Sequence, residues 1–178
     1  HIYLNPSKNM LALGVPGMDL SGGHGGSMSG KGKVVVLNAQ TVEITKLIEL
    51  SEMNHNAIFS PDGKEIWTSQ MAEMGKVLVY DATTYAVKNT IEVGMEPAEV
   101  TFSYDGMMAF VANGGSNSVT VIDVTNKTIM KTISVGMNPV GAWTGSDNKM
   151  YVDNEMSQTV SIIDVATMNV VDSISLGF

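Results

Sequence analysis

The chain has 178 residues, of which 44% are hydrophobic and 16% are charged, so it has ample apolar material for a folded core. Acidic residues outnumber basic residues by 18 to 10, which gives a net charge of −8, and no run of basic residues is present that could bind a nucleic acid. The absence of cysteine excludes disulfides, thiolate catalysis, iron–sulfur clusters and cysteine-bound zinc.

In chain order, four similar units of about 42 residues follow one another. We place them at about 1–53, 54–95, 96–137 and 138–178. The first begins with a strand near Ile2–Leu4, and the last ends with a strand at Val170–Leu176. Each unit contains a β-branched run that ends in Asn or Asp, namely at Asn38, Asp81, Asp123 and Asp164. The recurrence of these end residues indicates a structural role, such as capping the turn that follows.

Each unit is predicted to contain four short strands, a to d, separated by turns. In the third unit these are 99–102, 109–112, 119–123 and 129–135. Ser60-Pro61-Asp62-Gly63 has the composition of the tight turn between strands a and b. The pattern predicts an all-β protein with almost no helix, in which Val79, Val121 and Ile162 are buried and Trp67 and Trp143 pack between units.

Sheets of four strands that must stack to bury both faces are typical of β-propeller blades. The segments Phe110–Asn113 and Tyr151–Asn154, and the repeated Val-Gly-x-x-Pro at 93–97 and 135–139, resemble the YVTN repeat over essentially the whole chain. This resemblance implies a seven-bladed propeller of the bacterial or archaeal cell envelope, as in surface-layer proteins and periplasmic redox enzymes. It identifies a scaffold and not a reaction.

Only four blades are present, so the ring is expected to be completed by further blades of a seven- or eight-bladed ring, by a second copy, or by closure of the four blades alone. The chain starts at His1 and shows no signal-peptide pattern, which we interpret as a mature or excised form. Its apolar stretches are far shorter than the roughly 20 residues of a membrane span.

The b-to-c and d-to-a connections of a propeller meet at one face, the channel mouth, where function is expected. The first unit carries an insertion there, residues 15–32, which is rich in glycine. One interpretation is a flexible surface loop, and the other is a site that includes His24, Met28 and Met18. The spacing of its glycines does not match a nucleotide-binding loop.

His1 and His55 are predicted at the starts of the first two a strands, with Met53 close by in sequence. Imidazole and thioether groups together favour copper, so one prediction is a copper site formed by these residues and the loop residues His24, Met28 and Met18. The alternative is structural, because methionine fills irregular gaps and a single histidine is often only hydrogen-bonded. Glu73, Glu96, Glu99 and Glu155 are expected near the same mouth as solvated carboxylates.

Three classes of function remain open. The first is an extracytoplasmic (periplasmic, secreted or cell-surface) scaffold that binds a protein or a small molecule at the channel mouth. The second is a copper-binding or redox accessory protein, because the histidines resemble those by which the propellers of nitrous oxide reductase and cytochrome-type nitrite reductase seat copper or haem. The third is part of an enzyme, which is the less favoured since the sequence has no Ser-His-Asp arrangement and no haem-attachment motif.

Overall fold

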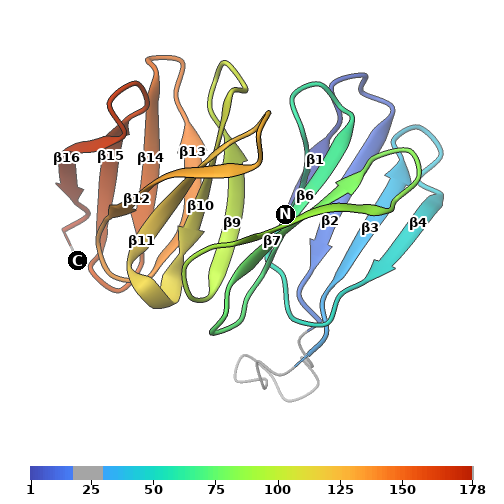
Figure 1. The fold of residues 1–178 in the computed structure, drawn as a ribbon, viewed down its shortest axis with the longest axis horizontal. Coiled ribbons are helices and arrows are strands. Elements are labelled where there is room, and N and C mark those ends of the chain that lie inside the picture. Colours follow the sequence, from blue (N-terminus) through green and yellow to red (C-terminus); the bar gives the residue numbers. More distant parts are fainter. Residues whose placement is uncertain (18–29, 178) are drawn as a thin grey trace.

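The computed structural model describes residues 1–17 and 30–177, which form four four-stranded antiparallel sheets (Figure 1). Blade 1 comprises β1 (Ile2–Leu4), β2 (Met10–Val15), β3 (Lys33–Asn38) and β4 (Ile44–Glu49). Blade 2 comprises β5 (Ala57–Phe59), β6 (Glu65–Gln70), β7 (Lys76–Asp81) and β8 (Val87–Glu92). Blade 3 comprises β9 (Pro97–Phe102), β10 (Met108–Asn113), β11 (Ser118–Asp123) and β12 (Thr128–Ser134). Blade 4 comprises β13 (Pro139–Thr144), β14 (Lys149–Asn154), β15 (Thr159–Asp164) and β16 (Asn169–Ser175).

The predicted all-β propeller architecture is confirmed. Within each sheet the strands lie in chain order, so the third strand of each blade is an interior strand. In the described ranges the only helical element is a single 3-10 turn, Gly114–Ser116. No helix in the part of the chain that the structure describes is long and apolar enough to cross a bilayer.

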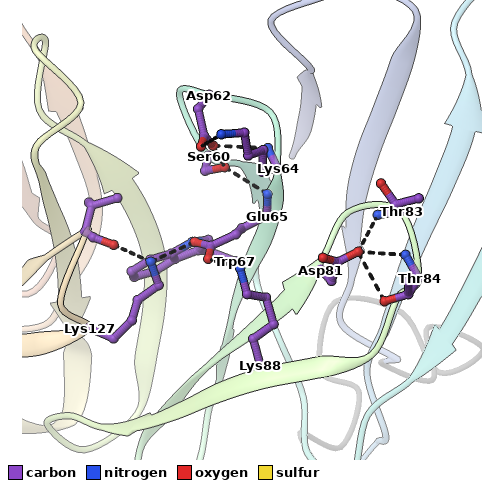
Figure 2. Close-up of polar contacts among 11 residues, drawn as sticks. Ser60, Asp62, Lys64, Glu65, Trp67, Asp81, Thr83, Thr84, Lys88 and Lys127 are labelled. Carbon is purple, nitrogen blue, oxygen red and sulfur yellow. Dashed lines mark hydrogen bonds and ion pairs between the residues drawn. The ribbon is translucent and has the colours of Figure 1, made fainter.

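Turn residues at the face opposite the channel mouth play the predicted local roles. The Asp81 carboxylate accepts hydrogen bonds from the backbone N–H groups of Thr83 (2.9 Å) and Thr84 (2.7 Å), as Figure 2 shows. Asp123 and Asp164 cap their own c-to-d turns in the same way. In the a-to-b turn of blade 2, Gly63 has a φ of 72°, a conformation that glycine adopts without strain.

Consecutive blades pack through apolar rows on their facing sides. Between blades 3 and 4, one buried cluster joins residues of both sheets, namely Phe110, Val119, Val121 and Ile133 with Ala142, Met150, Val152, Ile163 and Val165. Similar clusters lie between blades 1 and 2 and between blades 2 and 3. The predicted burial of Val79, Val121 and Ile162 is confirmed. These interfaces hold the four blades in one stack.

The prediction that Trp143 packs between blades is wrong, although the same prediction holds for Trp67. Trp67 is fully buried against blade 3, whereas Trp143 remains 49% exposed. Trp143 belongs to β13, in the last blade of the arc, and its side chain is on the face that would meet a following blade. The difference therefore comes from position in the stack, because no described blade covers that face.

Candidate binding site at the channel mouth

The first strands of successive blades contact one another, β1 with β5, β5 with β9 and β9 with β13, so they line the central axis. The pairing registers place one residue of each blade at an equivalent position at the mouth end of these strands: His1, Asn56, Glu99 and Gly141. This layer, together with Tyr3, His55 and Asp153, is the channel-mouth cluster.

Asn56 shows the structural use of this position. Its Nδ2 donates a hydrogen bond to Val100 O at 2.8 Å, and its Oδ1 accepts one from Val100 N at 3.1 Å. Both bonds cross from blade 2 to blade 3 in a buried environment. At this position, therefore, both ends of a side-chain amide are hydrogen-bonded to the backbone of the next blade.

Glu99 occupies the same position in blade 3 but uses it differently. Its side chain is fully buried, and one carboxyl oxygen, Oε1, receives a short hydrogen bond from the Tyr3 hydroxyl and lies 3.1 Å from His1 Nδ1. The other oxygen, Oε2, has no hydrogen bond of normal geometry among the described residues, although the backbone N–H of Ala142 is close enough to lower the pKa of Glu99. Burial raises the pKa of Glu99, and the hydrogen bond from Tyr3 only partly opposes this rise.

His55 lies beside His1, with ring centroids 4.7 Å apart in an edge-to-face arrangement. Burial lowers the pKa of His55, which favours the neutral imidazole. Its Nδ1 is buried and lacks a hydrogen-bond partner within residues 1–17 and 30–177. Nδ1 of the ring therefore keeps an unused hydrogen-bonding capacity inside the cluster.

A second carboxyl, that of Asp153, lies near Glu99 on blade 4. It accepts a hydrogen bond from the backbone N–H of Gly141 at 2.5 Å, and burial raises its pKa, with the nearby Glu99 charge adding to the effect. Gly141 lets the Glu99 carboxyl lie close to the backbone of blade 4, because a Cβ on residue 141 would lie 2.9 Å from Glu99 Oε2. The cluster thus combines two carboxyls, two imidazoles and a phenol.

The structure brings together only part of the predicted site. His1 and His55 lie side by side, whereas Met53 is a buried residue in the connection between β4 and β5. His24, Met28 and Met18 lie outside the described residues. Within the described ranges, no group of three or more His, Asp or Glu side chains is arranged to hold a metal ion.

Sequence reasoning missed the roles of Tyr3, Asp153 and Glu99. Glu99 was expected to be a solvated carboxylate, and this expectation is wrong because the residue is completely buried. A signal was available: aligned on the repeat, Glu99 stands where Asn56 and His1 stand in blades 2 and 1. The contact between Tyr3 and Glu99 joins residues far apart in sequence and leaves no local signal.

The opposite face carries a groove of about 500 Å³ between blades 2 and 3, lined by residues that include Asp62, Glu65, Asp105 and Lys127. Glu65 pairs with Lys88 at 2.7 Å and with Lys127 at 2.9 Å (Figure 2). Asp62 and Asp105 accept hydrogen bonds from Ser60 and Ser103 in their own turns. Because these charged groups are engaged within the protein, we assign this groove a structural role.

The fold and the cluster define a β-propeller with ionisable groups gathered at its channel mouth. A family model described as YNCE-like beta-propeller matches residues 31–177, and the chain belongs to this family. No curated protein matches the chain.

Among solved structures, the chain is similar to Kuenenia stuttgartiensis hydrazine synthase, with a TM-score of 0.80 and 22% sequence identity. The match covers 98% of this chain and 48% of that chain, so the protein spans about half the length of this structural relative. At this level of identity the similarity shows the fold alone.

Proposed function

We propose that this protein is an extracytoplasmic propeller scaffold of the YVTN-repeat type that binds a ligand at its channel mouth. The observation that carries the proposal is Glu99, whose carboxyl is buried under His1 and Tyr3, while Oε2 has only the weak approach of the Ala142 backbone N–H in the described part of the chain. Burying a carboxyl without full hydrogen bonding costs free energy, and Asn56 shows that an amide would satisfy the same position. Ionisable groups kept buried at such a cost are typical of functional sites.

The ligand class that suits this cluster is a small cation that donates hydrogen bonds, such as an amine or the amino group of a peptide. Glu99 and Asp153 supply two carboxyls, and neutral His55 supplies a nitrogen acceptor. The net charge of −8 also attracts cations to the protein from a distance. The resemblance of the repeats to those of cell-envelope propellers, together with the absence of cysteine, supports the extracytoplasmic location.

Titration with methylammonium, putrescine and spermidine, followed by NMR of the histidine ring protons, tests this function. The chain has three histidines, so His1 and His55 report on the cluster through resolved signals. We expect at least one of these amines to shift the His1 and His55 signals saturably. Glu99→Gln should weaken this response at least about tenfold, because an amide cannot supply the negative charge.

Glu73→Gln is the matched control, since it removes the same charge from an exposed residue in the connection between β6 and β7. It should bind like the unmodified protein. If no amine shifts the two signals, or if Glu99→Gln and Glu73→Gln bind with equal affinity, the cluster is not a cation site.

The second candidate function is copper binding, and the observation that favours it is the 4.7 Å separation of the His1 and His55 rings. Two neutral imidazoles with a methionine thioether form a set of ligands that suits Cu(I). The thioether would come from Met53, Met28 or Met18, and His24 would be a further imidazole ligand. Anaerobic competition with a Cu(I) chelator should show a large loss of affinity in His55→Ala and in His24→Ala. Unchanged affinity in both variants would reject copper binding at this mouth.

A further inference from the structure

The face of blade 4 that points away from blade 3 has the layout of a blade interface. The strand registers align Trp143 with Tyr151 and Tyr151 with Ile162 in one cross-strand row. The same row in blade 3 is Thr101, Phe110 and Val121. All three of these residues are buried, on the side of blade 3 that faces blade 4. Farther along the face, Ile174 is 48% exposed, whereas its equivalent Ile133 is 6% exposed.

Neighbouring blades also match at one corner of their interface. The residue that begins the second strand of one blade faces a turn of the next blade. The residue it faces there has a positive φ and lies between the third and fourth strands. Between blades 2 and 3 this pair is Glu65 and Lys127, 2.9 Å apart. The other two interfaces have apolar pairs at this corner, which pack on the same core clusters: Met10 with Tyr85, and Met108 with Met168. The chemistry of the two partners agrees in all three interfaces.

A second pair of positions follows the same rule. Strand d of one blade reaches the turn of the next, where Lys131 Nζ donates a hydrogen bond to Asn169 Oδ1 at 2.7 Å between blades 3 and 4. Between blades 1 and 2, the equivalent Lys46 lies over the Tyr85 ring, 5.8 Å from its centroid. Each lysine meets an electron-rich group on its neighbour.

On the open face of blade 4 these two positions are occupied by Lys149 and Asp172. Lys149 pairs with Asp147 of its own a-to-b turn at 3.3 Å, an exposed contact that contributes little. The first blade of a second copy would bring Val42 opposite Lys149 and Glu43 opposite Asp172. That arrangement leaves the lysine without an acid and sets two carboxylates against each other, so it disfavours ring closure by a second copy.

We propose that the open face of blade 4 docks a further, non-identical propeller blade whose c-to-d turn presents a carboxylate to Lys149 and a basic or neutral side chain to Asp172. Trp143, Tyr151 and Ile174 supply the apolar surface that such a blade would bury, since Ile162 in the same row is already buried. The charged corner supplies the selection of the correct blade. This inference is independent of any ligand at the channel mouth.

An appended blade tests the proposal. A copy of residues 96–137 is fused after residue 178 of the full chain, either unchanged or with Lys127→Glu within the copy. The copy contains no tryptophan, and Trp67 is fully buried, so acrylamide quenching of fluorescence reports on Trp143. We expect the fusion whose appended blade carries Lys127→Glu (the Glu form) to protect Trp143 from quenching severalfold better than the fusion with the unchanged blade (the Lys form). Lys149→Glu in blade 4 should reverse this preference, so that the Lys form protects better.

Three results would overturn the proposal. Equal protection by the two appended blades would show that the charged corner selects nothing. Quenching of Trp143 at the level of the unmodified chain in both fusions would show that this face does not dock a blade. Light scattering that finds the unmodified protein as a dimer with a protected Trp143 would assign the face to a second copy.

Discussion

The side-chain amide of Asn56 is bonded at both ends to the backbone of Val100 in the next blade, through Nδ2 to O at 2.8 Å and through Oδ1 to N at 3.1 Å. We expect Asn56→Ala to lower the free energy of unfolding by about 2–4 kcal/mol, because it leaves two buried backbone groups without partners. Urea unfolding measures this loss. The exposed Ser7→Ala, in the a-to-b turn of blade 1, serves as the control and should cost about 0.5 kcal/mol or less. A loss in Asn56→Ala no larger than in the control would mean that these bonds do not hold the two blades.

The buried pair of Glu65 and Lys127 should be replaceable by apolar residues. Lys127→Met alone leaves the Glu65 carboxylate with fewer partners and should cost about 2–3 kcal/mol. The double variant Glu65→Met/Lys127→Met should recover part of this loss, because Met108 and Met168 occupy the same corner between blades 3 and 4. The recovery is incomplete because the buried Trp67 indole N–H, which donates to Glu65 at 3.0 Å, loses its acceptor. A double-mutant cycle by urea unfolding measures the coupling. If the two losses simply add, the residues do not act as a pair.

Glu65 also predicts a pH dependence of stability. Burial would raise the pKa of Glu65, but the hydrogen bonds from Lys88, Lys127 and Trp67 outweigh this effect and hold the pKa below its usual range. A depressed folded-state pKa stabilises the protein above the unfolded-state pKa of about 4.3, and the stabilisation disappears as pH falls through the folded-state value.

Unfolding free energies at pH 7, 5, 4 and 3 should therefore decline less steeply in Glu65→Met/Lys127→Met than in the unmodified protein. The other carboxylates with lowered pKa values, among them Asp81 and Asp123, are common to both proteins and cancel in the comparison. Parallel curves between pH 5 and 3 would contradict the assignment.

Val42 is poorly suited to its backbone conformation. It has a φ of 60° in the c-to-d turn of blade 1, where β-branched residues are strained, and its side chain is exposed. Val42→Asn should stabilise the protein by about 1 kcal/mol, as measured by urea unfolding, since asparagine tolerates the left-handed region. Thr41→Asn, at the preceding position of the same turn, is the control and should bring no gain. A destabilised Val42→Asn would mean that Val42 makes contacts that outweigh its strain.

The segment 18–29 should be dispensable for folding. Its described flanks lie in backbone contact, since a Cβ on Gly30 would lie 1.8 Å from Gly17 O. Replacing residues 18–29 with Gly-Gly-Ser should therefore change the free energy of unfolding by about 0.5 kcal/mol or less.

The end of this loop was predicted at residue 32, but Gly32 is tied to the blade by backbone bonds to Glu52 and Leu50. A replacement that extends through Gly32 is therefore the matched comparison and should be clearly less stable. Equal stability of the two replacements, or unfolding of the shorter one, would contradict this reading of the loop.

The sequence by itself determined the repeat, the strands and the turns of this protein. These features depend on local chemistry: β-branched runs favour strands, Gly63 accepts a positive φ, and Asp81 caps the turn that follows it. Because each blade repeats this local pattern, the number of blades and the burial of Val79, Val121 and Ile162 could be predicted before any contact was known.

Only the tertiary structure decided what each repeated position meets across a blade interface. Glu99 is aligned with Asn56, yet its carboxyl meets Tyr3 from a blade two units earlier. Trp143 is aligned with the buried Thr101 and the half-buried Ile58, yet no described blade covers it. Such outcomes depend on side chains that are distant in sequence and on the place of a blade in the stack. A local pattern encodes a strand and its two faces, but the partner of each face is set by packing, where shape and charge must match between separate sheets.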